Sequence, residues 1–299
     1  MAFIFHYHFN CFNSRVKNSI TLKNKLNCLK KNQNLKIEDF FIYPIKSTEG
    51  IRKSEVKVTS IGFDNDRYFA VANFKNEIVT ARENAQLLKL KTELHNNTLK
   101  ITFENESITV LLDSINNDIE LSLFKKEVAG KIINHEINDW LTGVLETESK
   151  LVCINFNKLR KTDSTEISFN DCYPIHLISK ESVASLNENL KKPVALSRFR
   201  PNIIVSGADA FQEEHWSTIS IGECEFKVVA NTKRCTLITI NPATGKKSTN
   251  QEPLRTIAKE NTSNSQANFG IYLVPTKLGT IRKTDTFIVQ SKFDNYTTI

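Results

Sequence analysis

Short segments with alternating apolar and polar positions dominate the first part of the chain. A period of two is typical of half-buried strands, and turn residues such as those at 73–76 and 96–97 separate the segments. The pattern therefore predicts a small β-barrel over residues 36–113. Its strands are expected at 40–45, 54–58, 68–72, 99–103 and 107–112.

The period changes between residues 118 and 146, where apolar side chains recur along one helical face. Further helices are predicted after Ser179, a suitable N-cap, and at Glu252–Pro253, where proline fits a first turn. The remaining apolar segments predict a second barrel with helices around it, so the fold class is mainly β with α (α+β). Its strands are expected at 151–155, 175–178, 202–205, 218–221, 225–229, 237–240, 271–274 and 286–289.

Composition changes this picture little. The chain has 299 residues, 40% of them apolar and 24% charged, which is typical of a soluble globular protein with one large or two modest cores. The net charge of +7 arises within residues 1–37, which hold seven basic residues and no acidic one. Because the rest of the chain is electrically balanced, we expect no binding of nucleic acid as a polymer.

Residues 1–34 form a basic, acid-free leader. Such a leader resembles a mitochondrial transit peptide but is poor in Arg and Ser, so a disordered extension or an early start codon is an open alternative. Its apolar run at 2–5 is too short to span a membrane. The six cysteines form no C-x-x-C pair, which favours a reducing compartment and argues against zinc and iron–sulfur sites. We expect a cytoplasmic protein, or a mitochondrial one if the leader is a transit peptide.

Cys235 stands out because it follows Lys233 and Arg234 at the end of an apolar strand. Neighbouring cations favour a thiolate, which is both the nucleophile and the metal ligand. The alternative is a small buried cysteine beside two surface charges. Basic and small polar residues also lie near the ends of other predicted strands and would form an anion pocket if the fold brought them together. These residues are Lys46, Ser47, Arg67, Arg82, Arg198, Arg200 and Asn202.

The order of these motifs resembles the MOSC family, named for the C-terminal domain of molybdenum cofactor sulfurases. The resemblance begins near Leu35 and implies a MOSC N-terminal β-barrel domain with a helical connection (35–150) and a MOSC domain (151–292). The motifs that carry it are Tyr43-Pro44-Ile45-Lys46-Ser47, Asp66-Arg67, Thr80-Ala81-Arg82, Arg198-Phe199-Arg200-Pro201-Asn202, Glu214-His215-Trp216, Arg234-Cys235, Asn241-Pro242-Ala243-Thr244-Gly245 and Phe269-Gly270-Ile271-Tyr272.

The resemblance implies a molybdenum cofactor, in which a pterin dithiolene with a terminal phosphate holds the metal, and Cys235 as both catalytic residue and metal ligand. The residues that it implies for cofactor binding are Lys46, Ser47, Arg67, Ser179, Arg200, Asn202 and Arg234. Arg82 and Arg198 are further candidates, each of which could instead be an ion-pair partner. Asp66 is expected to orient Arg67 through an ion pair.

Two-domain MOSC proteins of this kind imply an oxidoreductase that reduces small N-hydroxylated substrates such as amidoximes, hydroxamates and hydroxylated bases. The chain has no G-x-G-x-x-G turn and no cysteine cluster for an iron–sulfur relay, so electrons are expected from a separate cytochrome- or ferredoxin-type protein. Two alternatives are open. One is a sulfur carrier with a persulfide on Cys235, and the other is a cofactor-binding module without turnover.

Overall fold

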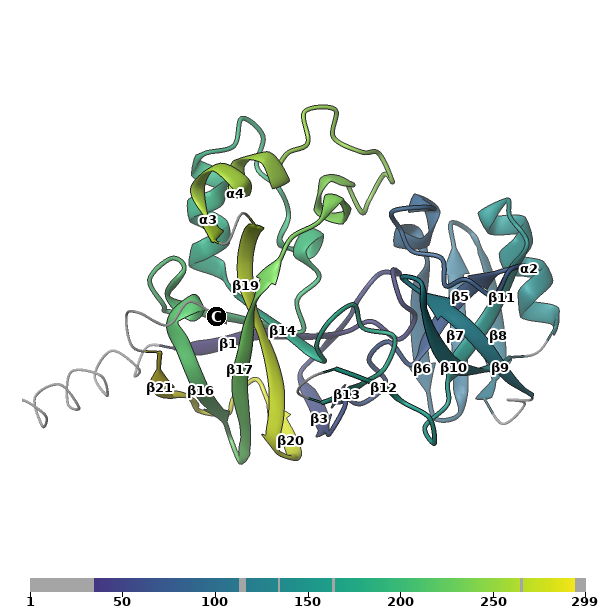
Figure 1. Cartoon of the computed structure of the whole chain (residues 1–299), viewed down its shortest axis with the longest axis horizontal. Helices are drawn as coiled ribbons and strands as arrows, with labels where there is room; N and C mark the ends of the chain where they lie inside the picture. Colours follow the sequence, from purple (N-terminus) through teal and green to yellow (C-terminus); the bar gives the residue numbers. More distant parts are fainter. Residues whose placement is uncertain (1–34, 113–116, 134, 163–164, 264–265, 294–299) are drawn as a thin grey trace, which may run out of the picture.

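The computed structural model describes residues 35–112, 117–133, 135–162, 165–263 and 266–293, so the predicted leader at 1–34 lies outside the described residues. Strands dominate and helices are few, which confirms the α+β class. The described elements gather into two bodies, seen side by side in Figure 1. No helix among the described residues is long and apolar enough to cross a membrane.

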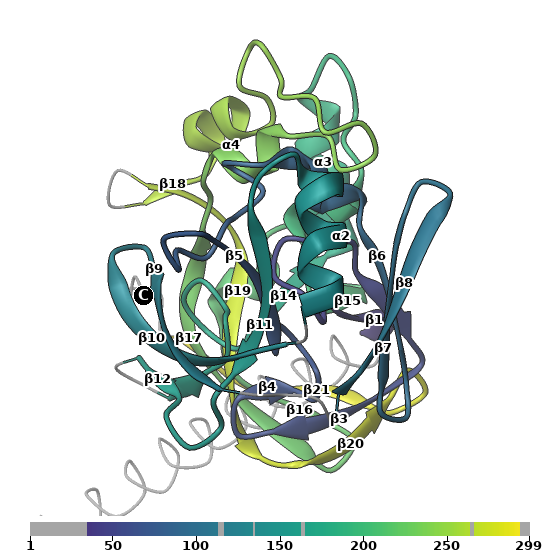
Figure 2. The same ribbon diagram turned by 90° about the vertical axis from the view of Figure 1, so that its right-hand side faces the viewer.

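The larger body is a curled sheet in which the neighbouring strands run in the order β2-β1-β15-β14-β19-β17-β16-β21. Two helices, α3 (Lys180–Glu188) and α4 (Leu254–Glu260), lie at one end of it (Figures 1 and 2). Its core includes Phe40, Trp216 and Phe287, all almost fully buried. The strands are β1 (Lys36–Ile42), β2 (Ile51–Lys53), β14 (Ile175–Ser179), β15 (Ile203–Ser206), β16 (Trp216–Ile221), β17 (Cys224–Lys233), β19 (Gln266–Lys277) and β21 (Phe287–Lys292).

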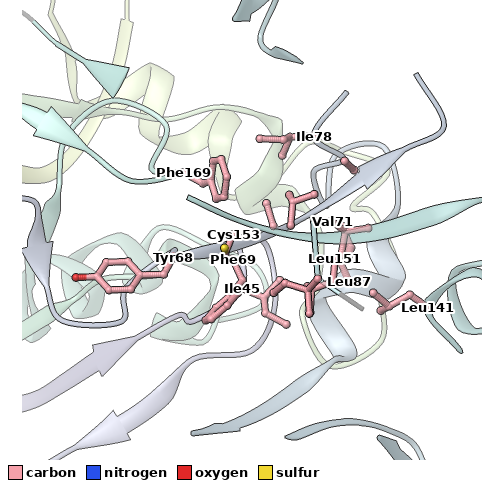
Figure 3. Packing of buried hydrophobic residues seen from close by; sticks show 14 of the residues in the cluster. Ile45, Tyr68, Phe69, Val71, Ile78, Leu87, Leu141, Leu151, Cys153 and Phe169 are labelled. Carbon is pink, nitrogen blue, oxygen red and sulfur yellow. The ribbon is translucent and has the colours of Figure 1, made fainter. Parts of the chain in front are cut away.

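The smaller body contains a four-stranded sheet, β5-β11-β10-β9, a three-stranded sheet, β6-β7-β8, and helix α2 (His135–Leu145). Its core joins the helix to both sheets. Leu141 of α2 belongs to the same buried cluster as Val71 and Leu151 of the four-stranded sheet (Figure 3). The strands are β5 (Phe69–Asn73), β6 (Lys91–His95), β7 (Thr98–Phe103), β8 (Glu106–Leu111), β9 (Asp118–Leu123), β10 (Lys126–Ile132) and β11 (Ser149–Ile154).

Strand pairing crosses between early and late parts of the chain. β1 pairs antiparallel with β15, and β3 (Glu55–Thr59) pairs with both β4 (Gly62–Phe63) and β20 (Gly279–Arg282). In the smaller body, the later strand β11 pairs antiparallel with the earlier strands β5 and β10. The pairings of β1, β3 and β4 attach the loops after β1 and β4 to the larger body. The two loops carry Lys46, Ser47 and Arg67, which line the cavity of the candidate site. The division into two domains near residue 150 stays a prediction.

Two predicted elements are wrong. The helical period does not extend back to Asp118, because 118–132 form the hairpin β9–β10, in which alternate residues such as Leu121 and Leu123 are buried. The expected strand at 237–240 is a short 3₁₀ helix, η5 (Thr236–Thr239), since the Ile238 amide bonds back to the Cys235 carbonyl at 3.4 Å. The predicted helices after Ser179 and Pro253 are confirmed as α3 and α4.

The polar segment 157–171 contains two short strands, β12 (Arg160–Lys161) and β13 (Glu166–Ile167). Its last residues turn back toward the rest of the molecule, because the Phe169 amide donates to the Arg67 carbonyl at 3.1 Å. The segment therefore delivers Asn170 and Asp171 to the cavity described next.

Candidate functional site

Side chains from both halves of the sequence converge on one cavity. Its empty volume, which includes space open to solvent, is about 780 Å³. All but one of the predicted cofactor residues line it, together with Cys235, Arg82 and Arg198. The lining residues are Lys46, Ser47, Arg67, Thr80, Arg82, Asn170, Asp171, Tyr173, His176, Arg198, Phe199, Arg200, Asn202, Lys233, Arg234, Cys235, Leu237, Ile238 and Tyr272.

Cys235 occupies the junction between β17, which ends at Lys233, and η5, which begins at Thr236. The residue is exposed, and Nη1 of Arg82 lies 3.1 Å from its Sγ, so the guanidinium donates to the sulfur. Cys153 and Cys224 differ, since both are buried and burial raises the pKa of each to about 11. An accessible sulfur with a cationic donor is the arrangement expected of a reactive or ligating thiol.

Lys46 and Asp171 form an ion pair at one wall of the cavity. The Lys46 ammonium also donates to the Phe169 carbonyl at 2.7 Å, and Arg82 lies 3.4 Å from the second Asp171 oxygen. Burial alone would raise the pKa of Asp171, but the charge and hydrogen bond of Lys46 outweigh it and hold this pKa at about 2. Asp171 therefore stays ionised, and no sequence motif singled it out.

The Tyr43 ring contacts two arginines of the site. The guanidinium carbons of Arg67 and Arg200 lie 4.3 and 4.2 Å from its ring centroid, within cation–π distance. The Tyr43 hydroxyl donates to the Pro201 carbonyl at 3.1 Å, which fixes the ring. Arg67 is paired with the buried Asp66, which confirms the predicted role of that carboxylate. Burial lowers the pKa of Arg200 to about 10, so the loss of solvation makes the charged form of this side chain less favourable.

Asn202 connects Arg67 to His176. Its Oδ1 accepts from Arg67 at 3.0 Å and from the His176 amide at 3.2 Å, while its Nδ2 donates to the Phe41 carbonyl at 3.1 Å. With both ends of the amide engaged, Asn202 orients Arg67 and offers little to a ligand. The sequence assigned it to cofactor binding, and its contacts favour a positioning role.

His176 was missed by the sequence because it sits within the apolar strand β14. Its Nε2 lies 2.8 Å from Nη2 of Arg234, and an arginine can only donate, so Nε2 must accept and the ring is neutral. Burial and the charge of Arg234 both lower the pKa of His176 well below its usual value. Arg234 also donates to the Phe269 carbonyl at 3.0 Å. His176 thus fixes the guanidinium that precedes Cys235.

Three residues of the site have left-handed backbone conformations. The φ angles of Ser47, Arg67 and Arg200 are 71°, 57° and 52°. Positive φ is uncommon for residues other than glycine, and such strain concentrates at functional sites. Backbone strain is therefore present at three cavity positions, each in a loop that follows or precedes a strand.

Ser179 is the predicted cofactor residue that the structure does not bring to the cavity. It is fully buried, and its hydroxyl oxygen caps α3 by accepting from the Ser182 amide at 3.1 Å. The same hydroxyl donates to Glu213 at 3.0 Å. Its hydroxyl is therefore engaged by Ser182 and Glu213 outside the cavity, which does not support the predicted role in cofactor binding.

Positive charge dominates the cavity. Seven Lys and Arg side chains line it against the single carboxylate of Asp171, counted over the described residues. Within that same part of the chain neither Arg200 nor Arg234 forms an ion pair, and burial lowers the pKa of each to about 10. Buried cations without anionic partners are costly, and a bound anion would relieve that cost. The donor set therefore fits a phosphate-bearing anion beside a thiol.

The fold and this site define a MOSC protein, and the family models agree. The MOSC N-terminal beta barrel domain matches residues 34–148 and the MOSC domain matches residues 164–287. The chain belongs to the MOSC family, in the group that includes the mitochondrial amidoxime reducing components.

Among curated proteins, mitochondrial amidoxime reducing component 2 of Rattus norvegicus is 32% identical over 276 residues, covering 83% of this chain and 81% of the relative. Mitochondrial amidoxime-reducing component 1 of Homo sapiens is 27% identical over 275 residues, covering 83% and 81%. Among solved structures, the YUAD protein of Bacillus subtilis is similar at 12% identity and a TM-score of 0.37, covering 85% of this chain and 93% of that one. A score this low supports no argument.

Proposed function

We propose that this protein is a molybdenum-cofactor-dependent reductase of N-hydroxylated compounds such as amidoximes, hydroxamates and hydroxylated bases. The observation that carries the proposal is the cavity in which an exposed thiol, Cys235, lies among seven cations with one carboxylate. The names of the relatives, amidoxime reducing components, support the substrate class.

Each side chain has a role that follows from its contacts. Cys235 would bind the metal through sulfur, a soft ligand, and Arg82 donates a hydrogen bond to that sulfur at 3.1 Å. Lys46, Ser47, Arg67 and Arg200 would hold the cofactor phosphate and ring, because guanidinium and ammonium groups form strong charge-assisted bonds to phosphate. The cofactor, when bound, supplies the two-electron redox centre.

Asn202 and His176 would act indirectly, because they hold the side chains of Arg67 and Arg234 in position. Asp171 has a pKa of about 2 and remains an acceptor at neutral pH. It can accept a hydrogen bond from a substrate N–H at the cavity wall, and it is unsuited to deliver a proton. The protons consumed by the reaction must therefore come from solvent or from another group.

The overall reaction converts an amidoxime, two electrons and two protons into an amidine and one water. The N–O bond breaks, the nitrogen is reduced, and the oxygen leaves as water. The two electrons require a donor, and we assign this to a separate cytochrome- or ferredoxin-type protein that docks transiently near the cavity mouth. The relatives are named as mitochondrial, which favours that location over the cytoplasmic one.

An accessible thiol also suits a second function, sulfur carriage as a persulfide on Cys235. Cofactor analysis separates the two functions. A reductase retains molybdenum and pterin in roughly equal amounts, whereas a sulfur carrier can be purified without either. Cofactor without any turnover would instead indicate a binding module.

The deciding experiment measures benzamidoxime reduction by the purified protein, checked free of flavin and haem. With an artificial low-potential electron donor we expect benzamidine to accumulate in proportion to bound molybdenum. With NADH or NADPH alone we expect none. A molybdenum-loaded protein that produces no benzamidine with the artificial donor would refute the reductase function. Sustained turnover with NADH alone would refute the separate electron donor.

A further inference from the structure

The turn between β9 and β10 has an unusual sequence for its geometry. Phe124 and Lys125 alone connect the two strands, with φ angles of 53° and 64°. Two-residue hairpin loops with both φ angles positive strongly prefer Asn-Gly, Asp-Gly or Gly-Gly. A bulky aromatic residue at positive φ is a genuine outlier, and such strain concentrates at ligand sites.

The strained turn lies at the edge of the cationic cavity. The Phe124 ring centroid is 5.4 Å from the Lys46 ammonium and 5.0 Å from the guanidinium carbon of Arg82. Arg82 in turn reaches Cys235 Sγ at 3.1 Å. One guanidinium therefore separates the Phe124 ring from the thiol, although β9–β10 belongs to the other body of the molecule.

A second hollow continues from this edge over the smaller body. It shares Thr80 with the cationic cavity and is lined by Phe124 together with the apolar Ile78, Val79 and Leu145. Phe124 is 48% exposed, so an aromatic face is available to a ligand. A substrate whose N–OH group lies near Cys235 would extend its remaining part across this ring.

We propose that Phe124 is a specificity-determining residue that packs against the planar, apolar part of an N-hydroxylated substrate. This inference rests on the proposed reductase function and adds to it a preference for aryl over small aliphatic substrates. Lys46 and Arg82 lie within cation–π distance of the ring, and its exposed surface offers stacking or edge-to-face contact to a substrate ring.

A purely supporting role is the rival explanation, in which the ring only holds Lys46 and Arg82 in place. Phe74 provides a matched control. It is also an exposed aromatic residue at a turn of the smaller body, with the Lys75 ammonium 5.4 Å from its centroid, and it lines neither hollow. Substituting Phe124 and Phe74 separately distinguishes the effect of position from the loss of an exposed aromatic side chain.

The first measurement compares kcat/KM for benzamidoxime and acetamidoxime in wild type, F124A, F124W and F74A, normalised to bound molybdenum. Aromatic pairs contribute enough that F124A should lower the benzamidoxime-to-acetamidoxime ratio about three- to tenfold, mainly through KM. F124W should restore the ratio, and F74A should leave it at the wild-type value. An equal loss for both substrates, or a fall in molybdenum content that accounts for the whole effect, would establish the supporting role and overturn the proposal.

The second measurement does not depend on turnover. Fluorine NMR follows the binding of 4-fluorobenzamidoxime to the same purified proteins, and we expect F124A to raise its Kd about three- to tenfold while F74A does not. If wild type bound this probe through Phe124 but reduced neither amidoxime, the reductase function would fail and the recognition surface would stand. An identical Kd in wild type and F124A would overturn the proposal even in an active enzyme.

Discussion

Two buried polar clusters of this protein differ in how their polar and charged groups are paired. In the first, the Glu213 carboxylate accepts from the hydroxyls of Ser179 and Ser182 and from the Ser179 amide, at 2.8–3.1 Å. In the second, Arg200 and Arg234 are surrounded by carbonyls, rings and other cations. The first cluster is internally satisfied, and the second is left with an excess of positive charge.

The difference shows which property marks a site. Burial of polar side chains is common to both clusters and does not distinguish them. Buried charges of one sign without counter-charges are costly, and a fold retains them where a ligand supplies the missing charge. By this criterion we propose Arg200 and Arg234 as site residues and exclude Ser179, although all three lie near the ends of predicted strands.

The largest effect is expected from Cys235→Ser. A hydroxyl is a harder and far less acidic ligand than a thiol, so bound molybdenum and amidoxime reduction should both be lost while the melting temperature of the cofactor-free protein is kept. Elemental analysis, a reduction assay and thermal unfolding of the same preparation measure the three quantities.

Cys153→Ser is the control for this change, because Cys153 is buried in the smaller body and its sulfur lies away from the cavity. It should lower the melting temperature and leave the metal content per folded molecule at the wild-type level. Stoichiometric molybdenum in Cys235→Ser would show that the thiol is not the metal ligand.

The next effect contrasts the two clusters directly. Arg200→Ala and Lys46→Ala should each weaken cofactor retention about tenfold or more, since a hydrogen bond to a charged group contributes about 1.5–3 kcal/mol. Pterin content after dialysis measures this loss, with the melting temperature of the cofactor-free protein as the check on folding.

Ser179→Ala should show the opposite pattern. It removes the cap of α3 and one donor to the buried Glu213, which should cost about 1–2 kcal/mol of unfolding free energy and leave pterin content unchanged. Loss of pterin from a Ser179→Ala protein of unchanged stability would return this residue to the cofactor site and break the distinction between the clusters.

The sequence predicted most of the cavity because its residues stand in contiguous motifs. Arg198, Arg200 and Asn202 occupy one loop, and Arg234 and Cys235 occupy one strand end, so short-range order alone groups them. The alternation of apolar residues also predicted most strands correctly. It failed at 118–132, where the local hairpin β9–β10 turns at Phe124 and Lys125 without the usual Asn or Gly, and at 237–240, where an apolar run forms a short 3₁₀ helix.

The residues that the sequence missed act through distant contacts. His176 lies in an apolar strand, and only its 2.8 Å contact with Arg234, 58 positions away, gives it a role. Asp171 depends in the same way on Lys46, 125 positions earlier. Neither a motif nor the apolar periodicity pointed to Phe124 as a functional residue. Its relevance comes from an uncommon turn conformation beside Arg82. Such roles depend on tertiary proximity and strain, which local patterns do not encode.

The smallest effect is expected at Glu214, which lies between the two clusters because it interacts with both Glu213 and Arg234. Burial and the neighbouring Glu213 raise the pKa of Glu214 to about 7, although Asn261 donates to it at 2.8 Å. Because the folded protein binds this proton more tightly than the unfolded chain, the associated stability is present below about pH 4.5 and is lost as the pH rises through about 7.

Glu214→Gln keeps the acceptor for Asn261 and removes the titration, so it should raise the melting temperature at pH 8 by about 2 °C. It should also flatten the decline between pH 5 and 8, in part only, because burial raises the pKa of Glu213 as well. Thermal unfolding across this range measures both effects, and parallel curves for wild type and variant would show that the Glu214 carboxylate is solvated and belongs to neither cluster.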